Sequence, residues 1–161
     1  VTLGTFPDAI RECVHLNAKV EKRILLITYL ASRSNFMKVK GLIWLGTRTS
    51  KFDEMRNFYQ NMMGLDTVHQ EPGFVVMDLP NGDRVEIFGD ESQYNTFFTH
   101  PVAGFLVEDI TAARAEMESQ GIEFMGPIKF DPSGDAWSHF RAPDGFVYEL
   151  TYSPNHPLLK E

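Results

Sequence analysis

The sequence has little cysteine and little continuous apolar sequence. A single cysteine, Cys13, excludes an intrachain disulfide and is typical of a protein from a reducing compartment. The apolar run from Ile24 to Ala31 is far shorter than the ~20 residues of a membrane-spanning helix. Nothing before this run resembles a signal peptide with a cleavage site. We therefore expect a soluble, cytoplasmic protein without a membrane partner.

Positive charge is scarce outside the first 36 residues. That segment has five Lys and Arg against three Asp and Glu, which leaves ten against nineteen for the rest of the chain. An acidic body repels the phosphates of nucleic acids, so we expect no nucleic-acid partner. The same charge favours cationic small molecules or a metal ion.

Several short catalytic motifs are also missing. The sequence contains no CxxC, HExxH, GxGxxG, GxxxxGK[ST] or GxSxG. Zinc knuckles, zincins, nucleotide-binding loops and nucleophile elbows therefore have no support.

The sequence does contain an internal repeat. The stretch LPNGDRVEIF (79–88) is similar to APDGFVYELT (142–151), and each matched pair lies 63 residues apart. In this match Glu86 aligns with Glu149, and both stretches hold a turn of Pro, then Asn or Asp, then Gly.

The regions before these two stretches follow the same order of elements. The first copy has a strand over 39–48, a helix ending at Gly64, and strands over 66–70, 74–79 and 84–88. Five apolar residues at helical spacing mark its helix: Phe52, Met55, Phe58, Tyr59 and Met62. The second copy has a strand over 102–107, a helix capped by Asp109 and ending at Gly121, and strands over 122–126, 137–141 and 146–152.

This order predicts an α+β fold of two tandem βαβββ modules, at about 38–93 and 100–155, within a domain over 37–157. Neither module can bury both faces of its sheet alone, so we expect one curved mixed sheet around a shared cleft. Residues 1–36 lie outside the repeat and are expected to form a helical extension, mainly over 8–30. This segment is an appended helix, upstream sequence ahead of a natural start at Met37, or an arm that packs on a dimer partner.

The residues from Lys38 to Pro154 resemble the vicinal oxygen chelate superfamily, which includes glyoxalase I, bleomycin-resistance proteins and extradiol dioxygenases. The resemblance rests on four stretches in the family's order: FYQNMMGL, LPNGDRVEIF, FLVEDITAARAEMESQGIEF and FRAPDGFVYEL. It implies the two-module fold, a small-molecule ligand in the shared cleft, and a homodimer.

In metal-dependent members, the resemblance implies two ligands from each module. The last-strand ligands match Glu86 and Glu149, but Trp44 and Val102 stand where the family places His or Gln. Neither side chain can donate a lone pair to a metal. We therefore expect no cofactor. A divalent metal, if one binds, would be held by Glu86, Glu149 and either His100 or His139.

Strand alternation indicates which other residues face the cleft. Arg84, Glu86 and Phe88 share one strand face, and Trp137 and His139 share another. Six residues are predicted to bind ligand: Trp44, Arg84, Phe88, Val102, Trp137 and His139. Glu86 and Glu149 are the predicted catalytic residues, against the alternative of solvated strand carboxylates. Without a metal between them, at least one should have a raised pKa, or the site should recruit a cation.

Two functions remain open. The first is a metal-independent binding protein that holds an aromatic or cationic ligand in an acidic cleft lined by Trp44 and Trp137. The second is a metal-dependent lyase or isomerase of the glyoxalase type, in which Glu149 or Glu86 moves a proton through an enediolate. A dioxygenase is disfavoured, because its iron site resembles a two-His, one-carboxylate site and the His positions are absent.

Overall fold

The computed structural model describes residues 37–160, so the helix expected over 8–30 lies outside the described residues. Its strands are β1 (Gly41–Arg48), β2 (Asp66–Glu71), β3 (Phe74–Asp78), β4 (Arg84–Phe88), β5 (Val102–Leu106), β6 (Glu123–Phe124), β7 (Lys129–Phe130), β8 (Ala136–Arg141) and β9 (Val147–Tyr152). Its helices are α2 (Phe52–Asn57), the π-helical turn η1 (Phe58–Met62), α3 (Ile110–Ser119) and the 3-10 helix η2 (Pro157–Leu159).

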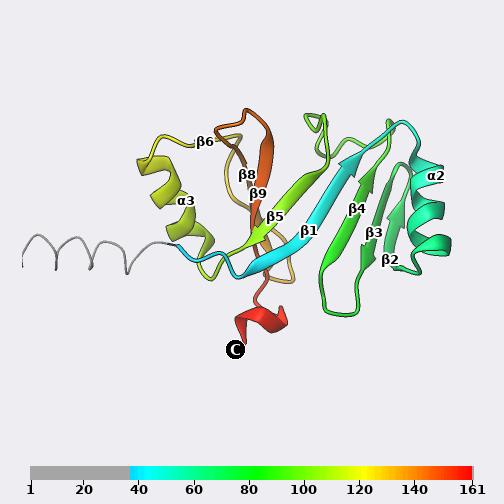
Figure 1. The fold of residues 1–161 in the computed structure, drawn as a ribbon, viewed down its shortest axis with the longest axis horizontal. Coiled ribbons are helices and arrows are strands. Elements are labelled where there is room, and N and C mark those ends of the chain that lie inside the picture. The colour runs from blue at the N-terminus through cyan, green and yellow to red at the C-terminus, as the bar shows by residue number, and fades with distance from the viewer. Residues whose placement is uncertain (1–36, 161) are drawn as a thin grey trace, which may run out of the picture. The chain divides into compact units, whose positions relative to one another are not determined.

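One curved mixed sheet contains the strands, in the order β2-β3-β4-β1-β5-β9-β8-β6 (Figure 1). The short strand β7 pairs with β8 outside this order. The first strands of the two halves, β1 and β5, are antiparallel neighbours at its centre. Each of them is parallel to the last strand of its own half, β1 to β4 and β5 to β9. This arrangement confirms the predicted fold of two repeated modules. The short strand β7 was not predicted.

The repeated turn is a hairpin in both halves. Gly82 has a φ of 89° and Gly145 a φ of 83°, a region that other residues rarely adopt. The Gly82 N–H donates to the Leu79 carbonyl at 3.0 Å, and the Gly145 N–H donates to the Ala142 carbonyl at 2.8 Å. The prediction from the Pro-Asn-Gly and Pro-Asp-Gly sequences is confirmed.

The first helix differs from its predicted pattern. Phe52, Met55 and Tyr59 pack against the buried core of β3 and β4, as their spacing predicts. Phe58 and Met62, however, are 39% and 75% exposed. The helix widens into the turn η1, which shifts the register of its second half and moves these two side chains away from the sheet.

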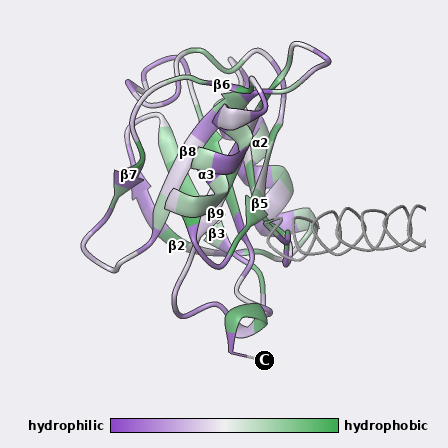
Figure 2. Cartoon of the chain, turned by 90° about the vertical axis from the view of Figure 1, so that its left-hand side faces the viewer, coloured by the Kyte–Doolittle hydropathy of each residue, from purple (hydrophilic) through white to green (hydrophobic). Residues whose placement is uncertain are grey.

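The second helix follows its prediction. Asp109 caps α3 by accepting the Ala112 N–H at 2.9 Å, and Gly121 lies just after its end with a φ of 87°. Ile110 and Ala113 are buried against the second half of the sheet. Figure 2 looks onto this helix, with the apolar strands β5 and β9 behind it. Within residues 37–160, no helix is both long and apolar enough to cross a membrane.

Candidate functional site

A cavity of about 270 Å³ lies between the two halves of the sheet. Both halves line it, and the residues are Trp44, Phe74, Arg84, Glu86, Phe88, Tyr94, Asn95, Lys129, Asp131, Asp135, Trp137, Glu149 and Thr151. The cavity therefore lies where the duplicated fold was expected to form a shared cleft. Aromatic and carboxyl side chains predominate among these residues.

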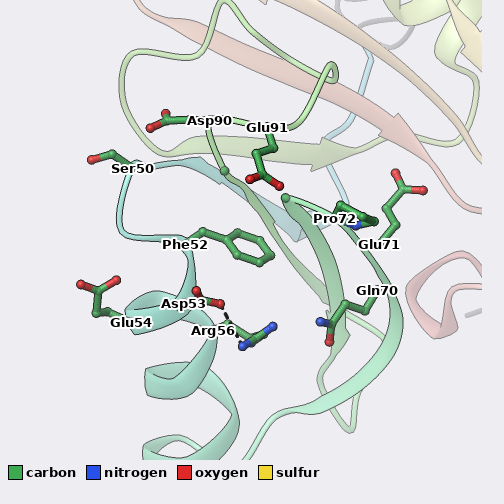
Figure 3. Close-up of a pocket in the computed structure, with 12 residues that line it drawn as sticks. Ser50, Phe52, Asp53, Glu54, Arg56, Gln70, Glu71, Pro72, Asp90 and Glu91 are labelled. Atoms are coloured by element: carbon green, nitrogen blue, oxygen red, sulfur yellow. Dashed lines mark ion pairs between the residues drawn. The ribbon is translucent and has the colours of Figure 1, made fainter.

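A larger hollow of about 690 Å³ lies at the outer edge of the first half, beside α2 (Figure 3). Its carboxylates include Glu71, Asp90 and Glu91, and its one arginine, Arg56, is paired with Asp53 at 2.9 Å. None of the residues predicted to act in the cleft lines it, and only one half of the sheet contributes. We therefore take the smaller cavity as the candidate site.

Trp44 lies across the centre of the sheet, where two glycines leave space for its indole. A Cβ on Gly46 would lie 2.1 Å from Trp44 Cη2, and a Cβ on Gly104 would lie 2.9 Å from Trp44 Cβ. Gly46 is the strand neighbour of Glu86, and Gly104 is the strand neighbour of Glu149. The indole therefore extends from the strand position beside Glu149 to the one beside Glu86.

Glu86 lines the cavity in an environment that favours its neutral form. Burial, followed by the charge of Glu149, raises the pKa of Glu86 to about 7. A hydrogen bond from Trp44 and the charge of Arg84 oppose this shift. Near neutral pH the Glu86 carboxyl can therefore either hold or release a proton.

Glu149 also lines the cavity but is only 4% exposed, and it lies beside His139, which is 6% exposed. Burial raises the pKa of Glu149 well above its usual range, against the charge of Lys129. Burial and the charge of Lys129 lower the pKa of His139 to about 4. His139 is therefore neutral near pH 7, and burial favours the neutral form of Glu149.

The contact between these two side chains is close but has unusual geometry. His139 Nε2 is 3.0 Å from Glu149 Oε2, yet an N–H on this nitrogen has no hydrogen-bond acceptor in line with it. The lone pair of a neutral Nε2 points in the same direction as its N–H would, so no hydrogen bond joins the two side chains in either tautomer.

The positive charge of Arg84 is largely compensated. Its Nε donates to Asp78 Oδ1 at 2.8 Å, and its Nη1 lies 4.0 Å from Asp135 Oδ2. Asp135 accepts the Ser153 hydroxyl at 2.8 Å, and the Asp135 N–H donates to Asp131 Oδ1 at 3.1 Å. The loop over 131–135 is thus an ordered wall of the cavity.

The linker between the two halves forms the opposite wall. Arg48 donates to the carbonyls of Asp90, Ser92 and Tyr94 at 3.1 to 3.4 Å, which fixes the path of the linker. Phe98 then lies edge-on to Trp44, with 6.1 Å between ring centroids. The linker, held by Arg48, therefore places the ring of Phe98 against Trp44.

Most of the predicted site residues meet at the cavity. Six of them line it: Trp44, Arg84, Glu86, Phe88, Trp137 and Glu149. Two predicted ligand-binding residues do not line it, because Val102 is fully buried in the core and His139 lies behind Glu149. His100 points elsewhere, with Nε2 3.2 Å from the Val147 carbonyl.

Several residues that line the cavity were not predicted from the sequence. Thr151 shares a strand face with Glu149, so strand alternation could have identified it. Phe74 could have been placed through its pairing with Phe88. Lys129 lies on the unpredicted strand β7, opposite Trp137, and Tyr94 lies in the linker. No pattern in the sequence marks these last two.

The donor set does not fit the metal site that the resemblance implies. Trp44 and Val102, the residues at the first-strand positions, supply no donor atom. Within residues 37–160, no three His, Cys, Asp or Glu side chains are grouped as metal ligands. The two carboxyls are left with an indole between them.

Comparison with known proteins agrees with this architecture. Residues 41–150 match the family model of the glyoxalase/bleomycin resistance protein/dioxygenase superfamily. The chain belongs to this superfamily. A search of curated proteins finds no match.

Several solved structures share the fold at low sequence identity. The methylmalonyl-CoA epimerase from Mycobacterium tuberculosis is 17% identical, with a TM-score of 0.56 over 71% of this chain and 89% of the epimerase. A superfamily member from Vibrio splendidus 12B01 is 15% identical, with a TM-score of 0.52 over 73% of this chain and 99% of its own.

The Mn(II)-bound glyoxalase from Novosphingobium aromaticivorans is 19% identical, with a TM-score of 0.59 over 73% of this chain. The match spans only 40% of that glyoxalase. At these identities the likeness shows the fold alone.

Proposed function

We propose that this chain is a metal-independent binding protein for a small planar molecule that carries a positive charge or N–H donors. The observation that supports this most strongly is the position of Trp44, whose indole lies in the cleft between two carboxyls. A flat aromatic face attracts rings and cations. Trp137 adds a second indole to the same cavity.

The charges around the cavity favour a cation over an anion. Four carboxyl groups line it, Glu86, Asp131, Asp135 and Glu149, although burial favours the neutral form of Glu149. Two basic side chains, Arg84 and Lys129, oppose them, but Arg84 is paired with Asp78 and Asp135. A bound cation would favour the ionised form of Glu86.

The volume of the cavity limits the size of the ligand. Pockets for drug-sized molecules span roughly 300 to 1,000 Å³. The cavity, at about 270 Å³, is below this range. It suits a molecule of one or two rings.

Three ligands of nearly the same shape test this proposal: benzamidinium, benzamide and benzoate. Calorimetry near pH 7.5 should give the tightest binding for benzamidinium, about tenfold tighter than benzamide, and no binding of benzoate. The Trp44→Ala variant should weaken binding of benzamidinium. Equal or tighter binding of benzoate would contradict the proposal.

Glu86 supports a second candidate, the lyase or isomerase of the glyoxalase type. A carboxyl with a pKa of about 7 that faces a cavity is suited to take and return a proton. An assay with the hemithioacetal of methylglyoxal and glutathione, with and without nickel or zinc, tests this candidate. Turnover that is lost in both Glu86→Gln and Glu149→Gln would favour it over simple binding.

A further inference from the structure

We propose that Trp44, seated on Gly46 and Gly104, determines what the cleft can hold. Its indole takes the space between Glu86 and Glu149, so the cleft accepts an organic ring and not a divalent metal ion. The ring ligand rests on the proposed function, but the exclusion of the metal can be tested without any ring ligand.

The two glycines make this position of the indole possible. With any side chain at position 46, the first added carbon would overlap the far edge of the indole, at 2.1 Å from Cη2 and 2.5 Å from Cζ2. At position 104, the added carbon would press on the near end of the same side chain, and would also lie 3.2 Å from Glu149 Oε1. The indole is held flat against the sheet by the absence of these two side chains.

The carboxyls on either side of Trp44 have polar neighbours other than a metal. Glu149 Oε2 lies 3.0 Å from His139 Nε2, and the indole of Trp44 opposes the rise in the pKa of Glu86. Three donor residues thus lie around Trp44: Glu86, Glu149 and His139. They belong to different strands and are not grouped as a metal site.

This geometry makes Trp44 the position where one substitution can change the chemistry of the cleft. An imidazole there would place a nitrogen donor between two carboxyls, in the donor combination that zinc and nickel prefer. Because an imidazole is smaller than an indole, it would also free part of the space that Trp44 fills. The indole therefore fills the space that a metal ion would need, and it supplies no donor atom in place of the missing ligand.

Calorimetry with zinc, nickel and manganese on metal-free protein tests the inference in three forms of the chain. The wild type and Trp44→Phe should bind each ion only weakly. The variant Trp44→His should bind zinc or nickel on the order of 100-fold more tightly. Trp44→Phe is the matched control, because it also shortens the side chain but adds no donor atom. Adding Glu86→Gln to Trp44→His should abolish the gain.

Two results would overturn the inference. One is a folded Trp44→His variant that binds metal no more tightly than the wild type, and the other is a wild type that already binds as tightly as this variant. Failure of benzamidinium to bind the wild type would contradict the proposed function alone. The two failures are therefore distinguishable.

A second substitution tests the inference if Trp44→His does not fold. Gly46→Ala adds one methyl group beneath the indole and should displace it, which shifts the tryptophan emission. The control is Gly41→Ala in the same strand, where the added carbon would meet the flexible end of Leu158 and lie at an ordinary contact distance of 3.6 Å from Ile43 Cγ2. Emission from Gly46→Ala that matches both the wild type and Gly41→Ala would show that the indole is not seated on Gly46, and would overturn the inference.

Discussion

Glu86 and Glu149 stand at the same place in the two halves of the molecule, and their surroundings differ. Glu86 is half-buried, and both Trp44 and the charge of Arg84 oppose the rise in its pKa. Glu149 is almost fully buried and lies against His139. The repeat explains why the two carboxyls lie on equivalent strands. Their burial and their polar neighbours differ because the surrounding residues are not repeated. We therefore expect one carboxyl to respond to ligand and the other to maintain the structure.

The largest difference between the two carboxyls should be in the stability that is lost when each is replaced by alanine. Glu149→Ala leaves a cavity in the core beside His139, so we expect the free energy of unfolding to fall by about 2–4 kcal/mol. Glu86→Ala opens onto the existing cavity and should cost about 1 kcal/mol or less. Urea denaturation of both variants measures the difference. Equal losses would show that the two sites are energetically alike.

The second-largest difference between Glu86 and Glu149 should be in how stability depends on pH. Its pKa rises from 4.5 to about 7 on folding, so the folded state binds this proton more tightly than the unfolded state. The resulting stabilisation is present below about pH 4.5 and is lost as the pH rises through about 7, with a total of up to about 3 kcal/mol.

Glu86→Gln removes this titration. Relative to the wild type, this variant should therefore be more stable near pH 8 than near pH 5 by about 1–3 kcal/mol. Thermal unfolding at the two pH values measures the effect. An identical pH profile for variant and wild type would show that burial does not raise the pKa of Glu86.

Ligand binding should depend on pH through the same group. A cation binds better to ionised Glu86, so the affinity for benzamidinium should rise by up to about tenfold between pH 6 and pH 8 and then level off. Calorimetry across this range should show the rise in the wild type and not in Glu86→Gln. A rise of equal size in the variant would assign the effect to another group.

The smallest difference concerns the two repeated hairpins. In the first, Asp83 Oδ1 lies 3.1 Å from Nε2 of the buried His156. In the second, Asp144 accepts the exposed Tyr148 hydroxyl at 2.9 Å. Asp83→Ala should therefore cost about 1 kcal/mol, and Asp144→Ala about 0.5 kcal/mol or less. Chemical denaturation measures both, and the reverse order would contradict this reasoning.

Much of the fold could be predicted because local sequence determines it. The hairpins at Gly82 and Gly145 follow from turn chemistry, and the cap at Asp109 follows from its side chain. The widened turn η1 could not be predicted, because its hydrogen-bond register is not visible in the spacing of Phe52, Met55 and Tyr59.

Site residues could be predicted only where they lie on regular strands, because strand alternation then shows which face of the sheet each residue occupies. Glu86, Glu149 and Trp137 lie on strands, so their faces could be inferred. Lys129 and Tyr94 enter the cavity from a short strand and a linker whose paths depend on long-range packing. Val102 was assigned to the cleft through the family pattern, but packing against Phe88 and Phe98 buries it completely.

The spacing between Trp44 and Gly46 can be recognised in a sequence without any coordinates. Trp44 can lie flat along its strand because the residue two positions later, on the same face, has no side chain. Among chains of this superfamily, an aromatic residue at the first-strand ligand position followed two residues later by glycine would therefore identify members whose clefts hold no metal. A second glycine is needed in the neighbouring antiparallel strand, at the position paired with the aromatic residue, as Gly104 is paired with Trp44. The criterion therefore has two independent parts.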